Sequence, residues 1–423
     1  MNKKIKIGLI GLGTVGGGVF KCLQQYENIE IVKIAVHNKN KKRNIDNLDE
    51  SIITDNPYEV VNNPEIQIVA ELIGGTEPAY DLIKTAMING KHIVTANKEL
   101  LAKHGEELFK IAQENNKVIL YEAAIAGGIP LIMPIKTILA GNKITKIKAI
   151  LNGTTNYILT KMDVLGASYN DVLREAQDLG YAETNPTGDV EGFDAAYKIT
   201  TLATIAFGKR IKFENVYREG ITQIRPEDMK AANEMGYKIK LIASAEMDEN
   251  NHADVRVHPM LVPKTKTLAH IDYVTNAVTL TGHPVGEITL SGPGAGEFPT
   301  ASSVLGDILA IVSELDNENI LPMMKCKHDE NAVMTNILDT KNKYYLSITA
   351  NNKTGVIAKL GKACEINNIS LASIVQKEIA KDECAEITVI TELCKEQDMR
   401  NVIAYLKADE SIVSVNSLIR VQL

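Results

Sequence analysis

A short apolar strand that runs directly into a glycine-rich turn and a helix opens the sequence. Residues 4–10 predict the strand, residues 19–24 have helical spacing, and the turn between them reads Gly11, Leu12, Gly13, Thr14, Val15 and Gly16. In such a unit the first glycine makes the turn, the second lets the backbone approach a pyrophosphate, and the third lets the helix pack on the strand. A glycine pattern alone can be a mere tight turn, but this context predicts a nicotinamide dinucleotide site.

The residues after the second predicted strand, 29–36, bear on which dinucleotide binds. An NAD-specific site usually has an acid about 20 residues after the glycine turn, where it bonds the ribose hydroxyls. Here the strand is followed by His37, Asn38 and Lys39, and then by Lys41, Lys42 and Arg43. Basic groups can bind a 2′-phosphate. We therefore favour NADP over NAD, with use of both cofactors, or a loop that is simply solvated, as the alternatives.

The order of the remaining segments predicts an α/β fold with three domains. Residues 1–135 alternate strands with helical stretches, which is typical of a parallel Rossmann-type sheet, and a helix within 300–318 returns to it. Residues 136–299 predict an α+β domain for substrate binding and dimerisation. A polar stretch at 319–342 is interpreted as a linker. Residues 343–423 have the order strand, helix, strand, strand, helix, strand, which predicts a ferredoxin-like domain.

Composition and charge exclude several classes of protein. The 423 residues carry a net charge of −7, which argues against nucleic acid or an anionic membrane as the main partner. No apolar run reaches the roughly 18 residues of a membrane span, and the N-terminus lacks the pattern of a signal peptide. The five cysteines are scattered, so we expect reduced thiols in a cytoplasmic protein. Cys326 and His328 stand alone in the polar stretch and do not predict a zinc site.

Two lysines and an aspartate are candidates for catalysis. Asp194 and Lys198 lie four residues apart on one face of a helix predicted over 190–207, among apolar neighbours that indicate burial. A buried acid–lysine pair suggests a function, whereas an exposed pair would only stabilise the helix. Asp189 is placed to cap this helix. Lys98 follows a strand at the edge where open α/β sheets bind ligands, although a lysine at a helix start is more often simply solvated.

The stretch 176–198, AQDLGYAETNPTGDVEGFDAAYK, resembles the motif of the homoserine dehydrogenases. The similarity extends along the chain through GLGTVG at 11–16, TANK at 95–98, AAIAGGIP at 123–130, NGTTNYIL at 152–159 and GPGAG at 292–296. The resemblance implies the NAD(P)-dependent interconversion of L-homoserine and L-aspartate 4-semialdehyde, in the biosynthesis of threonine, methionine and isoleucine. No aspartokinase portion precedes the dinucleotide unit in this sequence, so we expect the monofunctional form.

The resemblance also implies roles for individual residues. Lys198 is expected to give and take the proton at the substrate oxygen, with Lys98 beside that oxygen and the nicotinamide. Glu183 and Asp194 match substrate ligands, and Asp189 is expected to support them. Cofactor contacts are expected from residues 11–16 and from His37, Lys39, Gly74, Lys98, Gly180 and Gly296. A monovalent cation, Na⁺, is expected at Glu122 and the backbone carbonyls of Ile125, Gly127 and Ile129.

The C-terminal unit resembles an ACT domain, a module that senses amino acids. Such domains usually bind an effector at the first strand–helix loop, where an acid precedes a glycine. Here Asn352 stands at the place of the acid, upstream of Gly355, and an amide carries no charge for an ammonium group. An amino-acid effector site and a purely structural oligomer interface therefore both remain open. We expect a homodimer through the middle domain, or a homotetramer.

Two other functions compete with this interpretation. A semialdehyde dehydrogenase that forms an acyl-enzyme needs a nucleophilic cysteine. Cys22, the only cysteine before residue 326, lies among apolar residues of the first predicted helix, which suits packing. A non-catalytic sensor of NADP and an amino acid would not need Lys98 and Lys198, and both are present. The sequence therefore favours the dehydrogenase.

Overall fold

The computed structural model describes residues 4–315, 328, 330–379 and 384–422. The chain forms two compact units, and each is assembled from separate stretches of sequence. The first unit consists of Met1–Ile147, Asp194–Val216 and Thr275–Ala332, and the second of Lys148–Phe193, Tyr217–Val274 and Val333–Leu423. Among the described helices, none combines the length and the apolar character that a membrane span requires.

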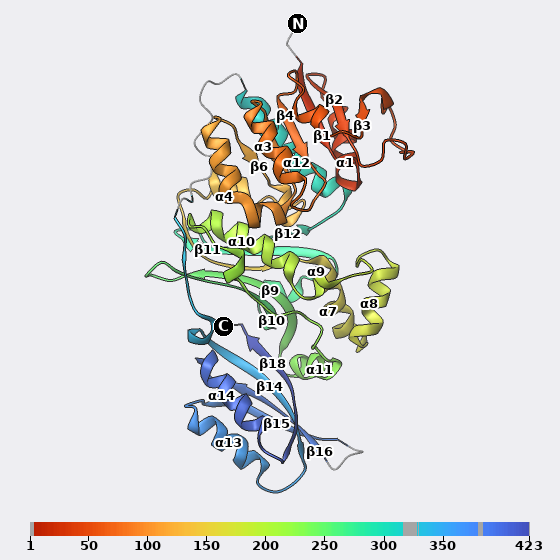
Figure 1. The fold of residues 1–423 in the computed structure, drawn as a ribbon. Coiled ribbons are helices and arrows are strands. Elements are labelled where there is room, and N and C mark those ends of the chain that lie inside the picture. Colours follow the sequence, from red (N-terminus) through yellow and green to blue (C-terminus); the bar gives the residue numbers. More distant parts are fainter. Residues whose placement is uncertain (1–3, 316–327, 329, 380–383, 423) are drawn as a thin grey trace. The chain divides into compact units, whose positions relative to one another are not determined.

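A six-stranded parallel sheet forms the centre of the first unit (Figure 1). Its order is β3-β2-β1-β4-β5-β6, which is the order of doubly wound dinucleotide-binding folds and confirms the predicted α/β class. The strands are β1 (Ile5–Ile10), β2 (Ile29–Ala35), β3 (Ile53–Thr54), β4 (Ile68–Glu71), β5 (His92–Thr95) and β6 (Ile119–Leu120). The helices between them are α1 (Thr14–Leu23), η1 (Glu50–Ile52), α2 (Tyr58–Val61), α3 (Ala79–Ile88) and α4 (Lys98–Glu114).

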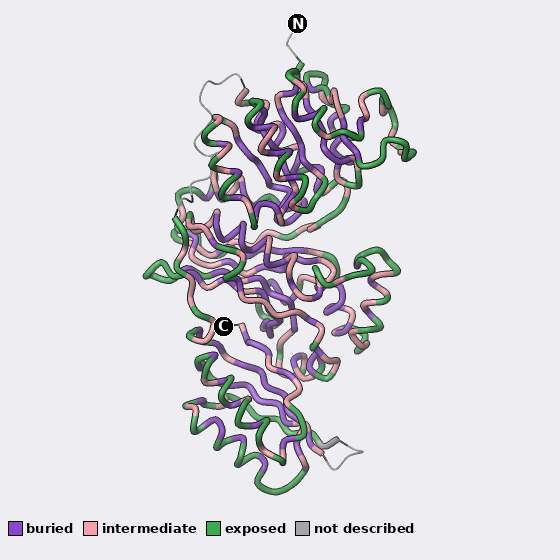
Figure 2. The backbone as a smooth tube through the Cα atoms, in the orientation of Figure 1, coloured by how far each residue is buried: buried purple, intermediate pink, exposed green. Residues whose placement is uncertain are grey.

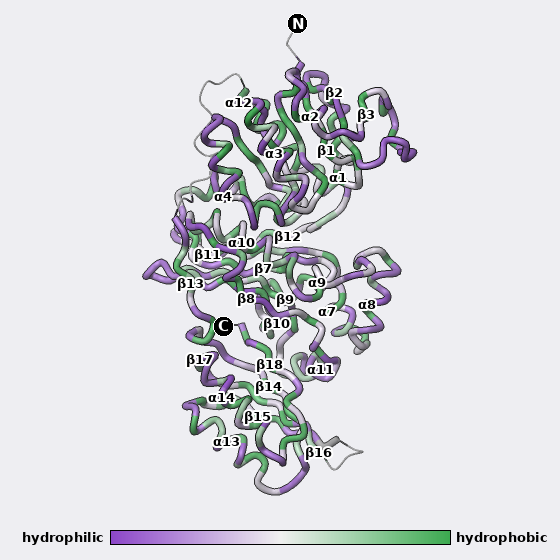
Figure 3. Tube along the Cα trace, in the orientation of Figure 1, coloured by the Kyte–Doolittle hydropathy of each residue, from purple (hydrophilic) through white to green (hydrophobic). Residues whose placement is uncertain are grey.

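The core of the first unit explains why its strands are almost continuously apolar. A parallel sheet covered on both faces buries both sets of side chains, and Ile7, Leu9 and Ile34 are completely buried. These strands stand out as buried in Figure 2 and as hydrophobic in Figure 3. The later helix α12 (Glu297–Glu314) adds Val304 and Ile308 to the same core. The helix near residue 300 thus packs into the core of the first unit.

The first unit also contains elements that the three-domain prediction assigned to the middle domain. These are the helix α10 (Phe193–Phe207, from Asp194 onward) and the antiparallel pair β11 (Thr275–His283) and β12 (Gly286–Pro293). Gly192 has a φ of +77°, so the helix predicted over 190–207 begins only at Phe193. The unit is completed by α5 (Ala123–Ala126), α6 (Ile132–Lys136), η2 (Phe213–Asn215) and the start of β7 (Lys143–Ile150).

The second unit contains a sheet that includes the C-terminal strands, in the order β9-β10-β18-β14-β16-β15. Its helical segments are α7 (Gly153–Leu165), α8 (Tyr169–Asp178), α9 (Thr187–Val190), α11 (Pro226–Glu234) and η3 (Thr267–His270), and the short β8 (Tyr217–Arg218) joins β10. The central strands are β9 (Tyr237–Met247) and β10 (His252–Pro263), which are antiparallel.

The C-terminal part of this unit has the predicted ferredoxin-like order. Its elements are β14 (Lys341–Asn351), α13 (Val356–Ile366), β15 (Leu371–Ile379), β16 (Cys384–Thr391), β17 (Cys394–Lys395), α14 (Glu396–Lys407) and β18 (Ile412–Val421). Leu346, Leu360 and Val402 lie in its separate hydrophobic core. β18 pairs in parallel with β10, which joins these strands to the rest of the unit.

The prediction of a linker at 319–342 is wrong for the last ten residues of that stretch. Residues 333–342 contain β13 (Val333–Met334), η5 (Ile337–Asp339) and the start of β14. β13 pairs with β10 because the edge of that strand offers free backbone groups, and polar composition did not reveal this pairing. The boundaries of the three predicted domains also differ from the two units, since residues 148–193 and 217–274 group with 333–423.

Candidate active site

The turn after β1 has a distinct geometric requirement at each glycine. Gly11 has a φ of +105°, and a Cβ there would lie 2.8 Å from the carbonyl oxygen of Leu72. A Cβ on Gly16 would lie 2.2 Å from the carbonyl oxygen of Gly11. Beside Gly13, which precedes α1, no atom lies within 4 Å of such a Cβ among the described residues. The turn thus leaves open space at the helix start, where a pyrophosphate can approach the N–H groups.

The basic segment after β2 lies on the surface. Residues 37–42 are exposed (Figure 2), and the ammonium of Lys39 lies 3.7 Å from the carboxylate of Asp55. Arg43 holds the loop together by donating to the backbone carbonyls of Asn38 (2.7 Å) and Lys41 (2.8 Å). His37 and Lys39 are therefore available to a phosphate at the carboxyl end of β2.

A buried polar network joins the carboxyl ends of β4 and β5. Thr95 donates to the carboxylate of Glu71 (2.6 Å), and Asn97 donates its N–H to the Thr95 hydroxyl (3.0 Å). The Asn97 side chain accepts from the N–H of Leu100 (3.1 Å) and so caps α4, which begins at Lys98. Burial raises the pKa of Glu71. This network orients the start of α4, and its signal in the sequence was the pair of capping residues in Thr95-Ala96-Asn97.

The same network reaches the predicted cofactor residue Gly74. The backbone N–H groups of Ile73 and Gly74 donate to the carboxylate of Glu71 over 2.9 and 3.3 Å. Gly74 has a φ of +72°, which favours glycine, and a Cβ there would meet no described atom within 4 Å. The loop after β4 is thus fixed by Glu71, a residue that did not stand out in the sequence.

Both candidate lysines bind the same carboxylate. The ammonium of Lys98 lies 2.5 Å from Asp194 Oδ1, and that of Lys198 lies 2.7 Å from Asp194 Oδ2. Lys98 comes from α4, whereas Asp194 and Lys198 lie one turn apart on α10. The spacing of Asp194 and Lys198 predicted their pairing, but the contact with Lys98 joins segments far apart in the sequence.

The environment of these three groups is only partly closed. The side chains of Lys198 and Asp194 are 10% and 11% exposed, whereas that of Lys98 is 40% exposed. Burial alone would raise the pKa of Asp194, but Lys198 and Lys98 lower it below its ordinary value. The carboxylate is therefore ionised, and it lies between the ammonium groups of the two lysines. Ammonium groups at this place suit an oxygen atom that becomes negative during a reaction.

The predicted substrate residues Glu183 and Asp189 and the predicted cofactor residue Gly180 lie in the second unit. Glu183 is exposed, and its backbone carbonyl accepts from the Gln177 side chain (3.1 Å); Gly180 has a φ of +75°. Asp189 lies inside α9 and does not cap the next helix, so that part of the prediction was wrong. Its carboxylate instead accepts from the Asn152 side chain (2.6 Å), and Asn152 caps α7.

The loop predicted to bind a cation is fixed by the carboxylate of Glu122. This carboxylate accepts from the N–H groups of Leu131 (2.5 Å), Ile132 (2.8 Å) and Met133 (2.8 Å), and so holds the start of α6. A Cβ on Gly127 would lie 2.4 Å from the carbonyl oxygen of Gly294, and a Cβ on Gly294 would lie 2.0 Å from the side-chain nitrogen of Asn276, so neither position has space for a side chain.

Some of the carbonyl oxygens in this loop already accept hydrogen bonds. That of Gly127 accepts from the Ser303 hydroxyl (2.6 Å), and the next turn ends at Gly296, which precedes α12. Among the described residues, no group of three or more His, Cys, Asp and Glu side chains has an arrangement that could hold a metal ion. Cys326 lies outside the described residues.

Comparisons with known proteins agree with this geometry. Residues 11–122 match the family described as homoserine dehydrogenase, NAD binding domain, and residues 130–309 match homoserine dehydrogenase. Homoserine dehydrogenases of Synechocystis sp. and Pseudomonas aeruginosa are each 40% identical to the chain, over 99% of both chains. The chain belongs to the homoserine dehydrogenase family. It is accordingly an NAD(P)-dependent oxidoreductase that interconverts L-homoserine and L-aspartate 4-semialdehyde.

Solved homoserine dehydrogenases share the fold. The enzyme from Thiobacillus denitrificans has a TM-score of 0.91 and 39% identity, and the match covers 99% of this chain and 98% of that one. A hyperthermophilic archaeal homoserine dehydrogenase in complex with NADPH has a TM-score of 0.64 and 27% identity. That match covers 74% of this chain and 98% of the archaeal one.

Proposed function

We propose that Lys198 gives and takes the proton at the substrate oxygen in the homoserine dehydrogenase reaction. The observation that carries this proposal is the carboxylate of Asp194, which holds the ammonium groups of Lys198 and Lys98 within 2.7 Å of its two oxygens. Lys198 is buried, so water competes little for its proton, and a positioned donor of this kind is what reduction of an aldehyde to an alcohol needs.

The other charged residues have complementary proposed roles. The dinucleotide, when bound by the turn at 11–16, supplies or accepts the hydride. Lys98 stabilises the substrate oxygen as it becomes negative, and Asp194 keeps both ammonium groups in place. Glu183 and Asp194 accept hydrogen bonds from the amino and hydroxyl groups of homoserine, and Asp189 supports them. Gly180 and Gly296 contribute cofactor contacts through their backbones.

A matched pair of lysine variants tests the proposed role of Lys98. Lys98→Met removes one ammonium group from Asp194, and we expect kcat/KM for homoserine to fall about 100-fold or more. Lys103→Met serves as the control, because Lys103 lies on the same helix but pairs with Glu99 (2.6 Å). Its kcat/KM should stay within about 2-fold of wild type, as is usual for an exposed pair. Equal losses in both variants would contradict the proposed role of Lys98.

We also propose that NADP is the preferred cofactor. The support is the exposed basic segment at His37 and Lys39, with no acid at the end of β2. Lys39→Glu should lower kcat/KM for NADP⁺ about 10-fold and leave that for NAD⁺ within 2-fold, since only NADP carries the 2′-phosphate. Lys110→Glu, an exposed change on α4, is the control. A wild-type enzyme with a strong preference for NAD⁺ would refute the proposal.

For residues 343–423, the C-terminal part of the second unit, we propose an ACT domain, supported by the βαββαβ order of these residues. Its amino-acid effector would bind at the loop after β14, where Asn352 accepts a long hydrogen bond from the Gln376 side chain (3.4 Å). Activity titrated with threonine, methionine and isoleucine tests this role, and no response to any of them favours a structural role. Light scattering tests the expected homodimer or homotetramer.

A monovalent cation at residues 122–129 is a further part of the proposal. The Glu122 carboxylate is engaged with α6, so the oxygen donors left for Na⁺ are backbone carbonyls, including those of Ile125 and Ile129. Carbonyl oxygens suit hard cations. Activity should fall when Na⁺ and K⁺ are both replaced by choline at constant ionic strength, and unchanged activity would contradict the cation site.

A further inference from the structure

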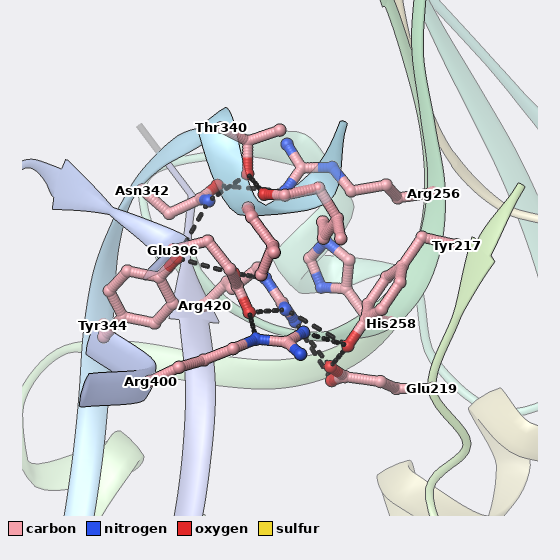
Figure 4. Close-up of polar contacts among 12 residues, drawn as sticks. Tyr217, Glu219, Arg256, His258, Thr340, Asn342, Tyr344, Glu396, Arg400 and Arg420 are labelled. Carbon is pink, nitrogen blue, oxygen red and sulfur yellow. Dashed lines mark hydrogen bonds and ion pairs between the residues drawn. The ribbon is translucent and has the colours of Figure 1, made fainter. Parts of the chain in front are cut away.

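A buried cluster of ion pairs lies around Arg420 in the second unit (Figure 4). Arg420, on β18, donates to both oxygens of Glu396 over 3.0 and 2.8 Å, and its Nη1 donates to both oxygens of Glu219 over 3.0 Å. Tyr344 also donates to Glu396 (2.6 Å). Arg420 and Glu396 belong to the ferredoxin-like part, whereas Glu219 follows β8. The cluster therefore ties the C-terminal strands to the segment that begins at Glu219.

The charges of this cluster are balanced. Arg400 donates to Glu396 (3.1 Å), so two guanidinium groups face two carboxylates. Burial alone would raise the pKa of Glu396, but Arg420 outweighs this effect, and the pKa lies below its ordinary value. Burial lowers the pKa of the neighbouring His258 well below its ordinary value, and that side chain adds no charge. The bidentate pair with Glu396 holds the guanidinium of Arg420 in one geometry, and its remaining nitrogen, Nη1, is thereby placed to hold Glu219.

The residues after Glu219 hold the end of α9. The N–H of Glu219 donates to the carbonyl of Val257 on β10 (2.8 Å), and the N–H of Ile221 donates to the carbonyl of Val190 (2.9 Å). Between them, a Cβ on Gly220 would lie only 2.4 Å from that same Val190 oxygen. Residues 219–221 are thus packed directly against the last residue of α9, without space for a side chain.

The segment held in this way carries Asp189. Asp189 lies one residue before Val190 in α9 and accepts from Asn152, as described above. Further along the chain, Arg218 lies over the ring of Phe193, 3.6 Å from its centroid, and Phe193 directly precedes Asp194. The residues on both sides of Glu219 therefore contact the stretch between the two aspartates.

We propose that Arg420 is a positioning residue for the homoserine site: through Glu219 it holds residues 219–221 against Val190, and so fixes the α9 segment that carries Asp189. The inference rests on the proposed role of Asp189 at the substrate site. Through this ion pair the C-terminal part of the second unit influences homoserine binding, although it contributes no residue to the homoserine site.

Glu219→Gln is the variant that tests the proposal. It removes one charge from the pair but leaves Arg420 bound to Glu396, so the fold is retained. We expect KM for homoserine to rise about 5- to 20-fold, while kcat and the Kd of NADP⁺ stay within about 2-fold, since bidentate charged pairs fix geometry more than neutral ones. Gly220→Ala should raise KM by a similar factor, because its Cβ would displace Val190.

Asp254→Asn is the matched control. Asp254 also pairs with an arginine, Arg256 (2.6 Å), which reaches Asn342 in the C-terminal part (3.3 Å). Its charge also acts on Arg420, but the hydrogen bonds and ion pairs of the described residues do not join it to residues 219–221, so the variant changes the charges near Arg420 without touching Glu219. Its KM for homoserine should equal that of wild type. Hydrogen exchange provides a readout besides activity: a peptide containing Ile221 should exchange faster in Glu219→Gln and at the wild-type rate in Asp254→Asn.

The outcomes separate this inference from the proposed function. An unchanged KM in Glu219→Gln, or an equal rise in Asp254→Asn, would overturn the role of Arg420. A rise in KM for Gly220→Ala alone would also overturn it, since the contact with Val190 would then not depend on the ion pair. If Asp189→Asn left KM for homoserine unchanged, the proposed role of Asp189 would fail, and the exchange rates of Ile221 would still decide the coupling.

Discussion

The two units each contain a cluster of charged side chains, and the clusters differ in how far they are open to solvent. In the first unit one carboxylate, Asp194, faces two ammonium groups, and Lys98 is 40% exposed. In the second unit Arg420 and Arg400 face Glu396 and Glu219, and Arg420 and Glu396 are 2% and 1% exposed. The first cluster is open to solvent at Lys98, where a ligand can reach it, whereas the centre of the second cluster is closed. The difference distinguishes a reaction site from a joint between parts of the fold.

The strongest test of this distinction is Lys198→Ala. It should lower kcat about 10²- to 10⁴-fold, because general acid–base groups contribute factors of this size. Asp194 keeps Lys98 as a partner, so the free energy of unfolding should change by only about 1 kcal/mol. Stopped-flow turnover and urea unfolding measure these two quantities, and titration with NADP⁺ should give a Kd close to that of wild type. Turnover near that of wild type would show that Lys198 is not the proton donor.

Arg420→Met should have the opposite profile. It leaves Glu396 and Glu219 without their shared partner, and breaking a buried pair typically costs about 3–5 kcal/mol of the free energy of unfolding. The folded fraction should keep its kcat within about 2-fold. Arg400→Met is the control, because Arg400 is 43% exposed and should cost less than about 1 kcal/mol. Similar losses of stability in both variants would contradict the conclusion that the buried pairs of Arg420 join parts of the fold.

Asp194→Asn tests whether the carboxylate that bridges the two lysines serves the substrate. The amide keeps the shape of the carboxylate but loses its charge, and hydrogen bonds to charged groups contribute about 1.5–3 kcal/mol. We therefore expect kcat/KM for homoserine to fall about 10- to 100-fold. Glu99→Gln, which affects only the exposed pair with Lys103, should leave it unchanged. A normal kcat/KM in Asp194→Asn would show that the Asp194 carboxylate only stabilises the fold and does not serve the substrate.

What the sequence could predict follows from how local each signal is. The turn at Gly11, the pair Asp194–Lys198 and the C-terminal βαββαβ order depend on residues close together in the sequence, and the fold contains all three. The contacts of Lys98 with Asp194 and of Glu219 with Arg420 join segments that are distant in the sequence. The spacing of residues along the chain does not predict such contacts. The sequence does not reveal β9 as a strand, because Lys238 and Lys240 interrupt its apolar residues. Lys240 is nevertheless buried, since it pairs with Asp272 (2.8 Å).

The smallest effect concerns His92, a buried titratable group of the first unit that belongs to neither cluster. Burial, helped by the charge of Lys117, lowers its pKa from 6.5 to about 4; its Nδ1 accepts from the N–H of Val118 (3.3 Å). As the pH falls below 6.5, the unfolded chain binds a proton that folded His92 does not. Stability is therefore lost from about pH 6.5 down to pH 4.

Between pH 7 and pH 5 this loss should amount to about 2 kcal/mol of the free energy of unfolding. His92→Asn keeps an acceptor for Val118 and removes the titration, so its urea unfolding should weaken less over the same range. The kcat of the variant at pH 7 should equal that of wild type, because His92 touches none of the three charged groups of the first cluster among the described contacts. An identical pH dependence in both proteins would mean that the pKa of His92 is the same in the folded and the unfolded chain, so that its burial does not affect stability.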